Sequence, residues 1–165
     1  MTVMSSAADD ITVIVDYAHT DDALRNLLEM ARPLAPRRLI TVFGAGGDRD
    51  RTKRPLMGMV AARLSDLVVI TSDNPRSEDP QRILDEINLG VEQETRQRDV
   101  DVRIIVDRRD AILYAASQAS AGDLVLIAGK GHEKYQEIGG QLLPFDDVAV
   151  AREALHARRD RLQVG

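Results

Sequence analysis

Five short apolar runs, rich in β-branched residues and spread along the chain, constrain the fold more than any other feature. Each run has the length of a strand that is buried on both faces of a sheet. The segments between them carry helix signals, so strands and helices alternate. This alternation predicts an α/β fold with a doubly wound, mostly parallel (Rossmann-like) sheet. The runs are residues 11–15, 39–43, 67–70, 102–106 and 124–128.

Helix start and stop signals support the alternation. Thr20 is expected to cap the first helix, and Asp79, which is followed by a proline, is expected to cap a later one. Gly90 is a candidate end for that later helix. Asp146 is expected to cap a last helix that continues into the basic segment 156–161.

The two ends of the chain carry further signals. Residues 135–138 and 141–143 flank Gly139-Gly140, which predicts a C-terminal β-hairpin before the last helix. Residues 1–10 lack the basic and apolar regions of a secretory signal and are expected to be a disordered lead-in. Residues 11–165 are then expected to form one domain of a cytoplasmic protein.

Composition and the absence of several motifs exclude several classes of protein. A net charge of -5 and a pI of about 5.2 argue against nucleic acid as the partner, and no apolar run has the length of a membrane helix. Without cysteine there is no disulfide or thiolate metal site, and the three histidines lack metal-ligand spacing. No phosphate-binding P-loop is present, and Arg49 replaces the third glycine of a dinucleotide fingerprint.

Four polar loops follow strands and are expected to meet at the carboxyl edge of the sheet, where such folds bind ligands. They begin at Asp16, Gly44, Ser72 and Gly129. The third contains Asp-Asn-Pro-Arg at residues 73–76, in which aspartate accepts from an ammonium and arginine binds a carboxylate through two nitrogens. Such a loop suits a ligand that is both cationic and anionic, for example an amino acid.

Each loop also has a simpler explanation. Residues 16–20 and 73–76 are compatible with ordinary turns, and the glycine-rich loops at 44–54 and 129–133 with solvated connectors. A different functional class is a non-catalytic module, such as a signalling receiver or a small-ligand-binding domain. Asp16, Asp73 and Lys130 imitate the receiver pattern, but Asp16 has no acidic neighbour.

The same loops resemble the Mur ligase family in the order in which they occur. The matching segments are residues 15–20, 42–57 (VFGAGGDRDRTKRPLM), 73–76 and 128–133 (AGKGHE). They are most similar to the C-terminal domain of the UDP-N-acetylmuramoyl-tripeptide synthetases that add meso-diaminopimelate. The family usually has proline where Asp21 stands and often cysteine where Ala45 stands, and neither difference removes a functional side chain.

The resemblance implies an ATP-dependent step of peptidoglycan synthesis, in which an acyl phosphate is attacked by the amine of the incoming amino acid. Its substrates would be meso-diaminopimelate, ATP and a UDP-N-acetylmuramoyl dipeptide. The P-loop, the Mg²⁺ ligands and the UDP-binding part are expected in domains upstream of this one, which alone would be inactive. Tyr17 and His19 would lie near the nucleotide. The residues expected to bind diaminopimelate are Arg49, Asp73, Asn74, Arg76, Gly129 and Glu133.

Overall fold

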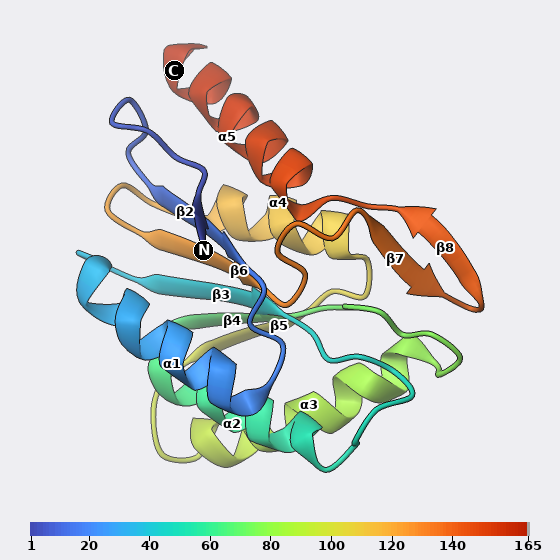
Figure 1. The fold of residues 1–165 in the computed structure, drawn as a ribbon. Coiled ribbons are helices and arrows are strands. Elements are labelled where there is room, and N and C mark those ends of the chain that lie inside the picture. The colour runs from blue at the N-terminus through green and yellow to red at the C-terminus, as the bar shows by residue number, and fades with distance from the viewer. Residues whose placement is uncertain (165) are drawn as a thin grey trace.

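The computed structural model describes residues 1–164 and contains a six-stranded sheet with helices on both faces (Figure 1). The strand order is β1-β2-β6-β3-β4-β5, and all neighbouring pairs are parallel except β1 with β2. This arrangement confirms the predicted mostly parallel sheet. The strands are β1 Thr2–Val3, β2 Thr12–Asp16, β3 Leu39–Phe43, β4 Leu67–Ile70, β5 Asp101–Ile104 and β6 Leu124–Ala128.

Helices α1, α2 and α3 cover one face of the sheet, and α4 and α5 cover the other (Figure 1). Alternate residues of β2, β3, β4 and β6 enter the two cores, so that Ile14 faces the layer of α1, α2 and α3 while its neighbours Val13 and Val15 face the layer of α4 and α5. The sheet is therefore doubly wound, as predicted. The helices are α1 Asp21–Ala31, α2 Lys53–Leu64, α3 Pro80–Thr95, α4 Arg108–Gln118 and α5 Asp147–Val164, with a 3-10 turn, η1, at Arg32–Leu34.

The expected helix caps are present. The Thr20 hydroxyl accepts a hydrogen bond from the Ala23 amide at 3.1 Å, and Asp79 accepts from Gln81 at 3.0 Å. Asp146 accepts from the amide of Val148 at 3.0 Å at the start of α5. Because α1 and α3 begin directly after site loops, these caps also fix the direction in which each loop leaves the sheet.

The predicted hairpin forms a separate two-stranded sheet of β7 (Tyr135–Ile138) and β8 (Gln141–Pro144). It is joined to the rest of the domain by a parallel bridge between Ile138 and Arg76, in the loop that follows β4. The hairpin therefore contacts one of the site loops directly.

The helix end expected at Gly90 is wrong, because α3 continues to Thr95. A Cβ at Gly90 would lie 1.8 Å from the Pro55 carbonyl oxygen of α2, and a Cβ at Gly58 would lie 2.1 Å from the Ile87 oxygen of α3. The two glycines therefore permit close contact between helix backbones rather than ending a helix.

The expectation that residues 1–10 are disordered is also not met. Thr2 and Val3 pair with Val15 and Ile14 as an antiparallel edge strand. Two bidentate ion pairs attach the following turn to α5, between Asp9 and Arg159 and between Asp10 and Arg158. A partner 150 residues away in the chain gives no local sequence signal, so the order of this segment could not be predicted.

Candidate functional site

A cavity of about 560 Å³ lies at the carboxyl edge of the sheet, between the loops that follow β2, β3, β4 and β6. The structure brings all of the sequence-predicted site residues into its lining. The cavity also reaches the first turns of α1 and α2, which the sequence analysis did not assign to the site. The predicted residues in the lining are Tyr17, His19, Arg49, Asp73, Asn74, Arg76, Gly129 and Glu133.

The acidic part of the lining is organised around Lys130, whose side chain is 0% exposed. Its ammonium donates to Asn74 Oδ1 at 2.9 Å and lies 3.4 Å from Asp73 Oδ1 and 3.3 Å from Glu133 Oε1. The Asn74 amide also donates to Glu133 Oε1, at 3.4 Å. Lys130 therefore orients three polar groups that come from two different loops.

These groups leave one uncompensated negative charge at this end of the cavity, since Asp73 and Glu133 face the single cation of Lys130. Burial raises the pKa of the Asp73 carboxyl above its ordinary value, and the nearby Arg108 and Lys130 oppose that rise. Within residues 1–164, the second carboxylate oxygen of Glu133 makes no hydrogen bond. It is free to accept from a ligand ammonium.

Arg108 supports this end of the site from beneath the sheet edge. Its guanidinium is fully buried and forms a bidentate pair with the buried Asp147 of α5, at 2.8 and 2.7 Å. It also donates to the carbonyl oxygens of Ser72 and Ala128, at 3.0 and 3.1 Å. Arg108 thus connects the ends of two site loops. Burial would lower the pKa of the Arg108 guanidinium, but the neighbouring Asp147 carboxylate raises it above its ordinary value.

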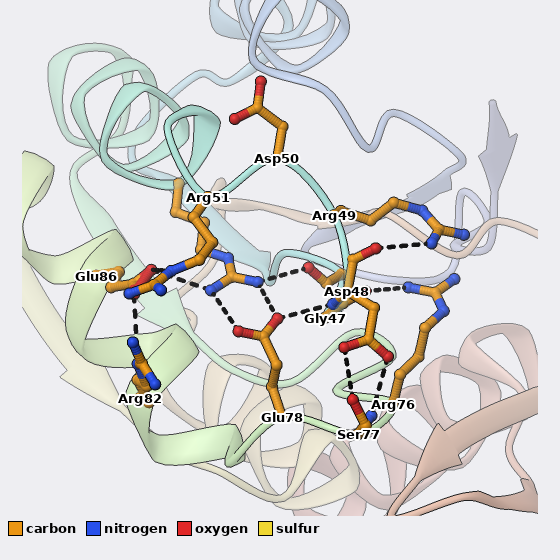
Figure 2. Close-up of polar contacts among 12 residues, drawn as sticks. Gly47, Asp48, Arg49, Asp50, Arg51, Arg76, Ser77, Glu78, Arg82 and Glu86 are labelled. Carbon is orange, nitrogen blue, oxygen red and sulfur yellow. Dashed lines mark hydrogen bonds and ion pairs between the residues drawn. The ribbon is translucent and has the colours of Figure 1, made fainter.

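The cationic part of the lining consists of Arg49 and Arg76. A Cβ at Gly46 would lie 2.8 Å from Arg76 Nη1 and 3.5 Å from Arg49 Cγ, so both side chains flank Gly46. Figure 2 shows the two guanidinium groups on the same side of their loops. Each binds backbone oxygen through Nη1, Arg49 at Asp48 and Arg76 at Gly47, both at 3.0 Å. Among residues 1–164 neither Nη2 atom makes a hydrogen bond.

Hairpin strand β7 holds the Asp73–Arg76 loop in place. Arg76 donates its amide to the Glu137 carbonyl at 2.8 Å, and Gln136 Nε2 donates to the Asp73 carbonyl at 2.8 Å. The Glu137 amide donates to Asn74 Oδ1 at 3.0 Å. Arg76 adopts a left-handed conformation with φ of 53°, which these bonds hold.

Tyr17 and His19 also line the cavity and are exposed. Their rings meet edge to face with centroids 4.6 Å apart, and His19 Nδ1 lies 3.0 Å from the Tyr17 carbonyl oxygen. Gly131, with φ of 57°, approaches so closely that a Cβ there would be 3.0 Å from Tyr17 Cβ. This aromatic pair has open faces on which a ring could stack.

Sequence reasoning missed four residues that organise the site: Lys130, Arg108, Gln136 and Arg54. Only Lys130 gave a signal, because a lysine between two glycines follows a buried strand. The other three are buried polar side chains whose partners lie far away in the chain. No local pattern distinguishes them from surface residues.

Two kinds of feature are absent from the described part of the chain. Within residues 1–164, no helix combines the length and apolarity needed to cross a membrane. In the same residues, no group of three or more histidine, cysteine, aspartate or glutamate side chains is arranged to hold a metal ion.

Comparison with known proteins gives the family. The model of the Mur ligase, glutamate ligase domain matches residues 1–131. This chain belongs to the Mur ligase family. A UDP-N-acetylmuramoyl-L-alanyl-D-glutamate–2,6-diaminopimelate ligase from Gloeobacter violaceus is 59% identical over 158 residues, covering 96% of this chain and 31% of that protein. A relative of the same name from Thermosynechococcus vestitus is 59% identical over 90% of this chain and 29% of its own length. The chain therefore spans less than a third of these Mur ligases.

Solved structures agree with this family. A UDP-N-acetylmuramoyl-L-alanyl-D-glutamate–2,6-diaminopimelate ligase superposes with a TM-score of 0.88 at 46% identity, over 96% of this chain and 31% of that chain. A murein peptide ligase from Psychrobacter arcticus shares the fold, with a TM-score of 0.61 at 18% identity over 93% of this chain and 28% of its own. The resemblance to the Mur ligases that the motifs indicated is confirmed.

Proposed function

We propose that residues 11–165 are the C-terminal, amino-acid-binding domain of a cytoplasmic ATP-dependent ligase. The ligase adds meso-diaminopimelate to UDP-N-acetylmuramoyl-L-alanyl-D-glutamate during peptidoglycan synthesis and releases ADP and phosphate. The name shared by the relatives, at 59% identity, supports this substrate.

The observation that carries the proposal is the separation of charge within the cavity. Arg49 and Arg76 present Nη2 donors that make no hydrogen bond within residues 1–164, although Arg76 Nε lies 3.5 Å from the Glu137 carboxylate. Asp73 and Glu133 present a net negative charge at another part of the lining. The far end of meso-diaminopimelate carries both a carboxylate and an ammonium, whereas lysine carries only the ammonium. The carboxylate fits the two arginines, and the ammonium fits the free oxygen of Glu133.

The remaining predicted residues complete this pocket. Asn74 joins the acidic and cationic parts, because its side chain binds Lys130 and Glu133 while its carbonyl accepts the Gly47 amide at 2.7 Å. Gly129 has φ of 121°, and even a Cβ there would remain 3.9 Å from Asp73 and Arg108, so a ligand can approach the backbone closely.

ATP is proposed to approach this domain at Tyr17 and His19, whose exposed rings are part of the cavity lining. By the resemblance to the family, the phosphate-binding loop and the Mg²⁺ ligands are expected in other domains. When bound there, Mg²⁺ would neutralise charge on the transferred phosphoryl group. The 165-residue chain alone is therefore expected to fold but not to hydrolyse ATP, and ATP turnover by the purified chain would contradict this.

The receiver alternative has little structural support. Asp73, the aspartate that a phosphodonor would have to reach, is 7% exposed and held by Lys130. Treatment with a small phosphodonor is expected to leave the chain unmodified, and phosphorylation of Asp73 would favour the receiver.

The test of the proposal is Arg76→Ala in the full-length ligase. Arg76 is 20% exposed, so its loss should reduce the preference for meso-diaminopimelate over lysine by on the order of 10³-fold. The measurement is amino-acid-dependent ADP release with each substrate. Arg103→Ala is the control, because Arg103 is an exposed arginine of the edge strand β5 whose side chain, within residues 1–164, hydrogen-bonds only the Val102 carbonyl. An unchanged substrate ratio in Arg76→Ala would refute the assignment.

A further inference from the structure

The two loops that carry Arg49 and Arg76 are joined behind the cavity by three residues that do not line it. Asp48 precedes Arg49 in the loop after β3, and Ser77 and Glu78 follow Arg76 in the loop after β4. We call Asp48, Ser77 and Glu78 the loop clasp. Figure 2 shows its members facing one another across the two loops.

The bonds of the loop clasp are reciprocal. The Asp48 carboxylate accepts from the Ser77 hydroxyl at 2.6 Å and from the Ser77 amide at 3.2 Å. In return, Glu78 Oε2 accepts from the Asp48 amide at 2.7 Å. Each loop therefore supplies both a backbone donor and a carboxylate acceptor to the other, which fixes their relative position in more than one direction.

A buried cation anchors the loop clasp. The Arg54 side chain is 1% exposed and binds Glu78 through both terminal nitrogens. It also donates to the Gly46 carbonyl at 3.1 Å and to Glu86 of α3 at 3.0 Å. Hydrogen bonding from Arg54 lowers the pKa of Glu78 to about 2, so this anchor is ionised at neutral pH. The clasp is thereby connected to the packed helices α2 and α3.

The backbone at the loop clasp is strained. Asp48 has φ of 55° and Arg76 has φ of 53°, and these are the only non-glycine residues with positive φ among residues 1–164. For non-glycine residues such a conformation is unfavourable and persists only where the surroundings hold it. Asp48 is held by the clasp, whereas Arg76 is held by the hairpin. Asp48 directly precedes Arg49, and Arg76 itself carries a guanidinium, so both strained positions lie at the two arginines of the cavity.

We propose that the loop clasp is a positioning device, which sets the distance between the guanidinium groups of Arg49 and Arg76 so that together they bind one carboxylate. This inference rests on the proposed function, since that carboxylate is the distal one of meso-diaminopimelate. The clasp residues touch no substrate. They determine specificity because a pair of donors displaced by about 1 Å loses much of its value for a bidentate partner.

Asp48→Gly tests this proposal without adding backbone strain, because glycine adopts positive φ freely. The variant removes the carboxylate that binds Ser77 and should weaken binding of meso-diaminopimelate to the 165-residue chain by about tenfold, with lysine binding little changed. Asp48→Asn keeps an oxygen acceptor and tolerates positive φ, so it should retain most of the affinity. Both are measured by titration with NMR detection.

The control variant is Glu92→Gln, which removes a carboxylate from α3 whose sole hydrogen bond among the described residues is with Asn88 of the same helix. It should leave the ratio of meso-diaminopimelate to lysine affinity unchanged. Equal affinity ratios in wild type and Asp48→Gly would overturn the proposal. A loss of equal size for both ligands would also overturn it, because the clasp would then be merely structural.

A readout without ligand separates this inference from the proposed function. The Nε–H signals of Arg49 and Arg76 and the amide exchange of Gly47 report the loop geometry directly. Asp48→Gly should shift these signals and speed exchange, while Asp48→Asn should restore them. If the wild-type chain does not bind meso-diaminopimelate, the proposed function fails. The NMR signals still test the loop clasp in that case, because unchanged signals in Asp48→Gly would refute its role in positioning.

Discussion

Gly90 lies in the interior of α3, where an alanine would ordinarily stabilise the helix by roughly 1 kcal/mol. Here we expect Gly90→Ala to be destabilising. The new Cβ would lie 1.8 Å from the Pro55 carbonyl oxygen, 2.7 Å from its carbon and 2.9 Å from its Cα. These are backbone atoms of α2, so no flexible side chain can move aside.

The magnitude follows from the separation that the two helices need. Contacts of a real Cβ below 3.0 Å are essentially never seen, so α2 and α3 must move apart by about 1 Å where Gly58 also packs closely. Overpacking of this kind costs about 1–3 kcal/mol, and occasionally more, which exceeds the gain in helix propensity. We expect a net loss of about 2 kcal/mol and a Tm lower by roughly 4–8 °C.

The assay is urea unfolding of the 165-residue chain, combined with calorimetry. Leu89→Ala is the control, because Leu89 adjoins Gly90 on α3 but is 56% exposed, so its truncation should change stability little. The helix shift should also loosen the Arg54–Glu86 pair between α2 and α3. A Gly90→Ala protein that is more stable than wild type would refute the steric reasoning and leave propensity as the deciding term.

Two further outcomes are expected from buried or ionised pairs. Because Arg54 lowers the pKa of Glu78 from 4.5 to about 2, the pair should contribute stability above pH 4.5 and lose it as pH falls toward 2. Glu78→Gln should therefore show a flatter decline of the urea midpoint across that interval, and an unchanged pH profile would contradict the pairing. Arg108→Met leaves Asp147 buried without its partner and should cost about 3–5 kcal/mol in urea unfolding. Adding Asp147→Leu should recover part of that loss, whereas a further loss in the double variant would count against the pair.

The sequence by itself determined the fold class and predicted which loops meet at the cavity. Strand runs and caps such as Thr20 and Asp79 are local signals, since a buried strand needs consecutive apolar residues and a helix start needs an acceptor within three residues. The loops at the ends of parallel strands must meet at one edge, which is why residues as distant as Tyr17 and Glu133 could be assigned to one cavity.

Only the tertiary structure decided how those residues are held. Gly90 has the same local signature whether it ends a helix or allows another backbone to approach, and α2 supplies the difference. Lys130 and Arg108 organise the site because their charged groups are buried away from water and must pair with carboxylates, which come from distant segments of the chain. Asp48 is part of the loop clasp only because the fold places Ser77 opposite it. Such contacts join segments that are far apart in the chain and leave no periodic pattern in the sequence. They can therefore be recognised only in the folded structure.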